Sequence, residues 1–125
     1  MPGERPVLST IDEHLVGDGV TVEVTLVSAG RAYAGQASGD AEPSHRARLV
    51  GEATLRAVES FTGGSITLDL TAMGTSDIGE MRVALAQVRE RGNGDLVGSA
   101  LIRHGDPVTA AAKAVLDAVN RRIGR

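Results

Sequence analysis

The sequence contains no cysteine and no tryptophan, and it has only one tyrosine and one phenylalanine among its 125 residues. Without cysteine the chain has neither a disulfide framework nor a thiolate metal site. With so few aromatic side chains it lacks the platforms on which single-stranded bases stack. Valine, leucine, isoleucine and alanine must therefore fill the core. Because these side chains bury little area each, oligomerisation would add to the stability of the fold.

Long hydrophobic runs are also missing. No apolar segment approaches the roughly 20 residues that span a bilayer, and the N-terminal segment MPGERPVLST has no apolar stretch of the signal-peptide type. The formal net charge of −3 argues against a dedicated nucleic-acid-binding protein, which needs a basic face. We therefore expect a single cytoplasmic domain over 1–125, with neither a membrane nor a nucleic acid as its partner.

The sequence also lacks the usual catalytic and metal-binding motifs. Its three histidines, His14, His45 and His104, have no metal-ligand spacing, and no serine stands in a nucleophile motif. The segment 74–80 carries two acids, Asp77 and Glu80, but offers too few oxygen atoms for calcium. We interpret it as a turn between two strands. The sequence therefore predicts a protein that is not an enzyme and that has no cofactor and no metal.

Alternating apolar and polar residues predict six short strands, three in each half of the chain. Turn residues at Ala29-Gly30 and at 91–95 separate neighbouring strands and indicate hairpins. The predicted strands cover 7–11, 22–26, 31–39, 66–71, 81–89 and 96–103.

Two alanine-rich segments have helical periodicity. The first carries its apolar residues between Val50 and Phe61 and ends at Gly63-Gly64. The second begins with Asp106, a capping residue, and Pro107, whose ring already sets a helical φ. Its apolar stripe is narrow and rich in alanine, which lets the helix approach a sheet or a second helix closely. The stripe consists of Val108, Ala111, Ala112, Val115, Val119 and Ile123.

The two halves of the sequence repeat each other. The pattern A-x-L-x-A-V occurs at 53–58 and again at 114–119, an offset of 61, and Gly35-Gln36-Ala37 matches Gly98-Ser99-Ala100 at an offset of 63. The two-residue difference fits into the turn before either helix. The sequence thus predicts an α+β fold of two tandem βββα units, over about 6–62 and about 64–123. In this fold a mostly antiparallel sheet has both helices packed on one face.

The second half contains, in order, a glycine-rich turn motif with an acid, a glycine in a later strand and a closing helix. The motifs are Gly74-Thr75-Ser76-Asp77-Ile78-Gly79-Glu80, Gly98, Asp106, Ala112-Lys113-Ala114 and Ala118-Val119-Asn120-Arg121. In this order and spacing, over roughly 65–123, the second half resembles the C-terminal regulatory domain of isopropylmalate synthase and citramalate synthase. In the first half only the helix matches, over 53–59.

The resemblance implies two βββα units, pairing of subunits through those units, and feedback binding of a branched-chain amino acid. The sequence departs from the family in two respects. It does not include the catalytic barrel, and the loop that shapes the effector site before the first helix is replaced by Ala47-Arg48-Leu49-Val50. Only the acid that follows this loop is echoed, as Glu52.

Three residues are candidates for an effector site: Arg48, Glu52 and Asp106. Arg48 and Glu52 are four apart and can form an ion pair on an exposed helix face. Alternatively, Arg48 can bind an anion near the start of the helix. Our leading hypothesis is a stand-alone, non-catalytic regulatory or dimerisation module that forms a homodimer. The alternative is a sensor of an amino acid or a 2-oxo acid whose pocket lies between the units near these three residues. An RNA-binding module is the least favoured hypothesis.

Overall fold

The computed structural model describes residues 5–123, which form six strands, two α-helices and one short 3₁₀ turn. Unit one holds three strands, the 3₁₀ turn and the first helix, and unit two repeats the three strands and the helix. In chain order the elements are β1 (Val7–Val16), β2 (Gly19–Ser28), β3 (Arg31–Asp40), η1 (Pro43–His45), α1 (Arg46–Phe61), β4 (Leu68–Ile78), β5 (Met81–Glu90), β6 (Gly94–Leu101) and α2 (Pro107–Ile123).

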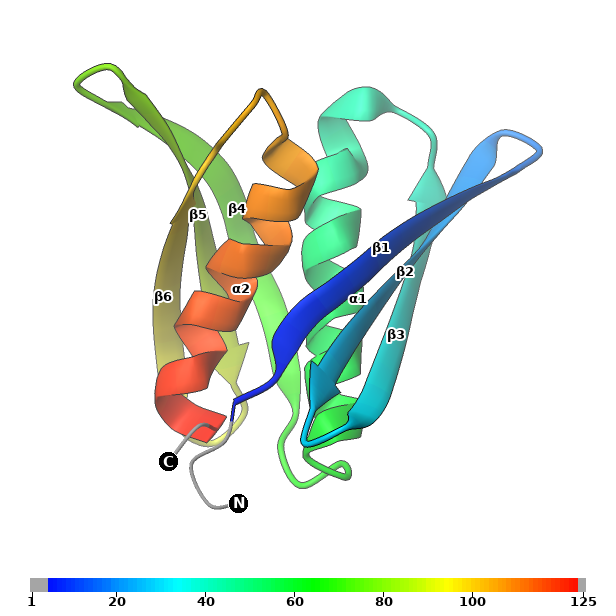
Figure 1. The fold of residues 1–125 in the computed structure, drawn as a ribbon, viewed down its shortest axis with the longest axis vertical. Coiled ribbons are helices and arrows are strands. Elements are labelled where there is room, and N and C mark those ends of the chain that lie inside the picture. The colour runs from blue at the N-terminus through cyan, green and yellow to red at the C-terminus, as the bar shows by residue number, and fades with distance from the viewer. Residues whose placement is uncertain (1–4, 124–125) are drawn as a thin grey trace.

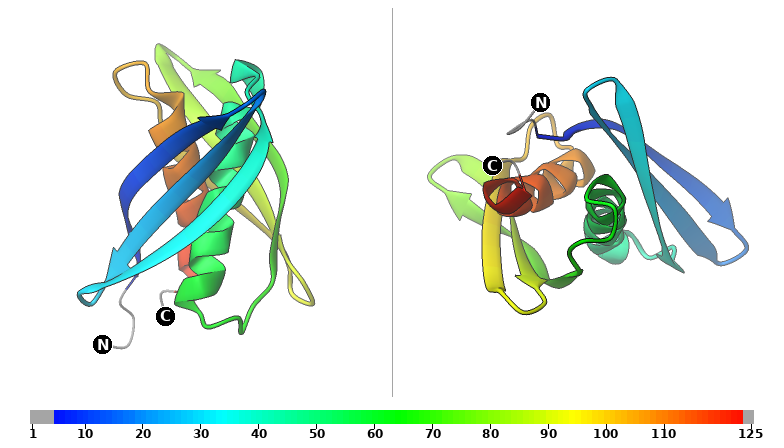
Figure 2. Two further views of the ribbon diagram at one scale, coloured as in Figure 1. Left: turned by 90° about the vertical axis from the view of Figure 1, so that its right-hand side faces the viewer. Right: turned by 90° about the horizontal axis from the view of Figure 1, so that it is seen from below.

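The fold is the α+β arrangement of two βββα units that the sequence predicts, with every neighbouring strand pair antiparallel. It differs from the expectation in the number of sheets. The strands form two separate three-stranded sheets, in the orders β1-β2-β3 and β4-β5-β6. Each helix packs on one face of its own sheet, and the helices also pack against each other. The helix pair therefore lies between the two sheets (Figures 1 and 2).

The two units have the same strand register. Leu8 pairs with Leu26 in unit one and Leu70 pairs with Val88 in unit two, and each residue is displaced by 62 positions from its counterpart. Both hairpins also have an irregularity at the same place, after Leu8 and after Leu70, where one residue is left out of the register. The repeat in the sequence is thus a repeat in the structure.

The lengths of one loop and of the last strands explain why the offset between the units changes along the chain. The β2–β3 turn has two residues, Ala29 and Gly30, whereas the β5–β6 loop spans 91–93, and this extra residue raises the offset from 62 to 63. The offset then falls to 61 because β3 has ten residues and β6 has eight, while the connection to the helix has five residues in each unit. The predicted place for this difference, the turn before either helix, is therefore wrong, because the difference lies in the length of the last strand of each unit.

One glycine in each unit lets the helix backbone come close to the last strand of its sheet. A Cβ atom on Gly35 in β3 would overlap the backbone of Ala53 and Ala57 in α1. A Cβ atom on Gly98 in β6 would overlap the backbone at the corresponding positions of α2, which are Ala114 and Ala118. The alanines are on the helix for the same reason, because a larger side chain would hold the two backbones apart.

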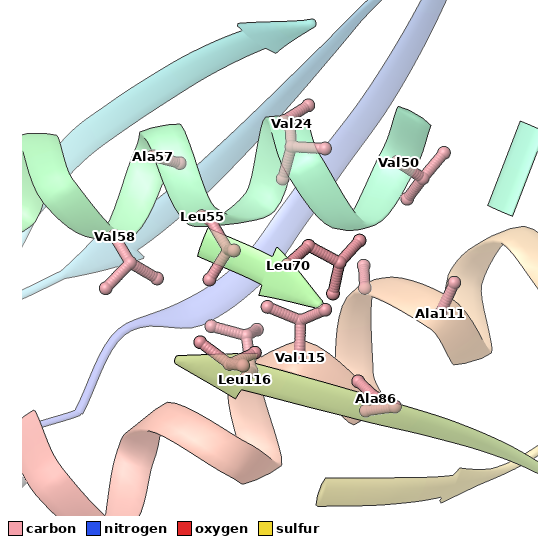
Figure 3. Close-up of a cluster of buried hydrophobic side chains, with 14 of the residues drawn as sticks. Val24, Val50, Leu55, Ala57, Val58, Leu70, Ala86, Ala111, Val115 and Leu116 are labelled. Carbon is pink, nitrogen blue, oxygen red and sulfur yellow. The ribbon is translucent and has the colours of Figure 1, made fainter. Parts of the chain in front are cut away.

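The buried face of α2 is wider than the predicted stripe because the helix packs against both its own sheet and α1. Leu70 from β4 and Val115 from α2 converge on Gly51 of α1, where a Cβ would lie 2.9 Å and 3.4 Å from their methyl groups. Figure 3 shows Leu70 and Val115 pointing toward each other between the helices. The residues of α2 that are buried in addition to the predicted ones are Ala110, Ala114, Leu116 and Ala118.

The prediction of a turn over 74–80 is wrong. Strand β4 continues to Ile78, and only Gly79 and Glu80 lie between it and β5. The glycine, serine and aspartate of this segment have low strand propensity, but each pairs with a residue of β5 along the whole hairpin. Likewise, the first strand, predicted over 7–11, extends to Val16 because it pairs with β2 throughout.

Candidate functional site

Asp106 caps α2, as the sequence predicts. Its Oδ1 accepts a hydrogen bond from the backbone N–H of Thr109 at 3.1 Å, and its Oδ2 accepts one from the Thr109 hydroxyl at 2.6 Å. These two bonds hold the pKa of the Asp106 carboxyl below its ordinary value, the hydroxyl contributing most. The carboxylate therefore acts as the N-cap that stabilises the start of the helix.

Arg48 and Glu52 form the predicted pair on α1, with 3.7 Å between Arg48 Nε and Glu52 Oε2. Arg48 also reaches across to unit two, where its Nη2 donates to the carbonyl of Leu70 at 2.9 Å. Arg56, two turns further along α1, donates in the same way to the carbonyl of Leu68 at 2.6 Å. β4 is an edge strand, so carbonyl groups on its open side receive no hydrogen bond from a neighbouring strand. The two arginines donate to these carbonyl groups instead.

The structure brings Arg48 and Glu52 together but does not bring Asp106 to them. Arg48 and Glu52 line a hollow of about 440 Å³ between β3, α1 and β4, together with Arg56 and Asp69. Asp106 lines a different hollow, of about 310 Å³, beside β6 and the first turn of α2. The predicted single pocket near all three residues therefore corresponds to two separate places.

Arg48 lies where several hollows meet. Besides the one described above, it lines a hollow of about 270 Å³ with Asp40, His45 and Glu52. It also lines a third hollow, of about 190 Å³, between the starts of the two helices, where Pro107 faces it from α2. Arg48 is thus the candidate residue with access to the surfaces of both units.

The acidic partner of His45 was not predicted from the sequence. The Oδ1 of Asp40, at the end of β3, accepts a hydrogen bond from His45 Nδ1 at 2.8 Å, and this contact holds the pKa of the Asp40 carboxyl below its ordinary value. The two residues are five apart and separated by a proline-containing turn. No helical or strand spacing connects them, so only the turn geometry brings them together.

Glu90 is the only charged side chain in the buried set of residues 5–123. It lies at the end of β5 with 3 % of its side chain exposed, and it accepts hydrogen bonds from Arg122 Nε at 2.8 Å and from Asn93 Nδ2 at 3.0 Å. The charge is therefore compensated by a cation and an amide, which is the usual condition for burying a carboxylate.

Neither the models of known protein families nor the curated proteins compared with this chain give a match. Among the described residues 5–123, no group of three or more histidine, cysteine, aspartate or glutamate side chains is placed to hold a metal ion. Neither helix in this part of the chain combines the length and the apolar composition needed to cross a membrane.

Proposed function

We propose that this chain is a non-catalytic regulatory or dimerisation module, similar in role to the regulatory domain of isopropylmalate synthase that its sequence resembles. The observation that carries the proposal is the apolar surface at the ends of two equivalent hairpins. Leu15 and Val16 are 74 % and 69 % exposed at the β1–β2 turn, and Ile78 and Met81 are 64 % and 50 % exposed at the β4–β5 turn.

Exposed apolar groups at the ends of both hairpins, with Val16 and Ile78 at equivalent positions, favour an interaction function because a monomer gains nothing from them. A core built mostly from alanine and valine buries little area per residue. Covering the hairpin ends in an assembly would add apolar burial that the isolated chain lacks. A dimerisation module in which two copies of the chain pair through their βββα units accounts for both features.

Sedimentation equilibrium of the purified chain tests this proposal. We expect a species of twice the 12.9 kDa chain mass, with a dimer fraction that rises with protein concentration. A chain that sediments as a monomer up to high micromolar concentration would contradict the proposal.

A small-molecule sensor is the second candidate function, and the charges around Arg48 favour it. A cation and a carboxylate, Arg48 and Glu52, line the same two hollows, with Asp40 and His45 in one of them. This arrangement offers opposite charges to a zwitterion, so that an amino acid would place its carboxylate on Arg48 and its ammonium group on Glu52.

Thermal unfolding with amino acids and 2-oxo acids tests the sensor function. A ligand at 100 times its Kd stabilises the folded chain by about 2.7 kcal/mol. In Glu52→Gln the shift with an amino acid should shrink while the shift with a 2-oxo acid, which has no ammonium group, should persist. Asp95→Asn is the matched control, because Asp95 forms a similar exposed pair with Arg89 outside these hollows. If no compound of either class shifts the transition, the sensor function is wrong.

A further inference from the structure

The ends of two hairpins form matching projections, which we call the arms: arm one is residues 12–21 of β1 and β2, and arm two is residues 74–83 of β4 and β5. The turn of arm one starts at Gly17 with φ +59°, and the turn of arm two starts at Gly79 with φ +61°. A glycine at this position of a two-residue turn is what hairpin geometry requires. Immediately before it stands an exposed apolar residue in each arm, Val16 or Ile78.

The two arms project at the same end of the molecule and diverge to opposite sides (Figure 1). Four of the seven large apolar side chains that are exposed in residues 5–123 belong to them, namely Leu15, Val16, Ile78 and Met81. Such a concentration at one end indicates an interaction surface rather than scattered exposure.

The arms differ in charge. In arm one, Asp12 and Asp18 are exposed, and neither makes a salt bridge within the described residues. In arm two, Asp77 is paired with Arg82 at 3.1 Å. Arg103 adds a second cation beside arm two, since its neighbour Ile102 donates a backbone hydrogen bond to the carbonyl of Arg82.

Glu13 in arm one is neutralised by Arg46 at the start of α1, and arm two carries a second carboxylate, Glu80, in its turn. Arm one thus has two carboxylates without a salt bridge in the described residues, whereas arm two, counted together with Arg103, has two carboxylates and two arginines. If arm one of one copy packed against arm one of the other, Asp12 and Asp18 of the first copy would face the same two carboxylates of the second. Two copies that placed arm one against arm two would instead bring these carboxylates next to Arg82 and Arg103.

We propose that a second copy of this chain docks on this end of the molecule, with arm one of each copy packed against arm two of the other. The inference rests on the proposed dimerisation function and specifies its interface. A two-fold axis produces the same contact twice and closes the assembly as a dimer. Leu15 and Val16 of one copy are covered by Ile78 and Met81 of the other, and the aspartates of arm one face the arginines of arm two.

Two single variants test where the interface lies. Leu15→Asp in arm one and Ile78→Asp in arm two each place a carboxylate into the contact, and each should raise the dimer Kd at least about tenfold. Both side chains are largely exposed, so the monomer fold should be retained, which circular dichroism verifies. Val97→Asp is the control, because Val97 is 58 % exposed on β6 away from the arms, and its dimer Kd should match that of the wild type.

Mixing the two variants tests which arms meet. A Leu15→Asp homodimer has the substitution in both of its contacts, and so does an Ile78→Asp homodimer. In a mixed dimer both substitutions fall into the same contact and the second contact is wild type. Native mass spectrometry of the equimolar mixture should therefore show a heterodimer at a concentration where each variant alone is monomeric.

Each other outcome contradicts this interface. If the wild type dimerises but both arm variants dimerise equally well, the interface lies elsewhere and the dimerisation function still stands. If the variants are weakened but mixing restores nothing, like arms meet. A monomeric wild type removes the proposed function together with this interface, and the arms then face a partner other than a second copy.

Discussion

The C-terminal ends of the two helices are held by different chemistry, although the two units have the same backbone. In unit one, Phe61 ends α1 and packs edge-on against Tyr33 of β3, with 5.2 Å between the ring centroids. In unit two, the corresponding position 122 is an arginine, which pairs with the buried Glu90. Both units thus have a side-chain contact at this place, but the contact is apolar in unit one and ionic in unit two.

The starts of the helices differ as well. Helix α2 has a side-chain cap from Asp106, whereas the residue before α1, His45, makes no capping bond with its side chain. Unit one has the 3₁₀ turn η1 in this place, and the described part of unit two has no such turn before α2. The two helices therefore differ in how they begin and in the side-chain contacts at their C-terminal ends, while the middle of each unit is the same.

The largest effect is expected where the units are the same. Gly35→Ala and Gly98→Ala each place a methyl group into the helix backbone, so each should destabilise the fold by about 3 kcal/mol or more, measured by urea unfolding. Gly74→Ala, a glycine in β4 with open space around it, is the control and should change stability by less than about 0.5 kcal/mol. If only one of the two glycine substitutions destabilises the fold, the helix and strand backbones do not approach equally closely in the two units in solution.

The C-terminal contacts should respond differently to salt. Arg122→Met leaves the Glu90 carboxylate buried without its cation and should cost about 2 kcal/mol, less than a fully buried pair because Arg122 is half exposed. Phe61→Ala should cost a similar amount through lost packing. Raising the salt concentration from about 0.1 M to about 1 M should reduce the Arg122 effect but leave the Phe61 effect unchanged. Equal salt dependence would contradict this difference between the units.

The capping difference should appear as a pH effect. Asp106→Ala removes the cap of α2 and should cost about 1 kcal/mol at neutral pH, whereas His45→Ala should leave the start of α1 nearly unchanged. The pKa of Asp106 is lower in the folded chain than its ordinary value, so its contribution is present at neutral pH and is lost as the pH falls through the lowered pKa. Wild type and variant should converge in thermal stability at low pH, and a constant difference would contradict this role.

The smallest effect is expected for the exposed pair on α1. Glu52→Gln weakens its contact with Arg48, and because both side chains are more than 40 % exposed, the loss should be only a few tenths of a kcal/mol. Chemical denaturation measures it. A loss above about 1 kcal/mol would show that Glu52 also supports the contact of Arg48 with β4.

The order and type of the elements could be predicted from the sequence because their signals are local. Val22, Val24 and Leu26 alternate along β2, and Asp106 and Pro107 stand at the start of α2. The limits of the strands were less predictable. Gly74 and Ser76 look like turn residues, yet they pair along β5, since the register of a hairpin overrides weak propensity. Of the candidate site, only the Arg48–Glu52 pair could be predicted, because four residues on a helix are always neighbours.

The sequence by itself determined the repeat, the two helices and the small glycine and alanine residues at 35, 53 and 57 and at 98, 114 and 118, because periodicity and residue size are written directly in the chain. Only the tertiary structure decided that the strands divide into two sheets around a central helix pair, that Asp106 lies apart from Arg48, and that Arg48 and Arg56 cover the edge of β4. These depend on how distant segments pack. Contacts between residues far apart in the chain leave no period or spacing in the sequence.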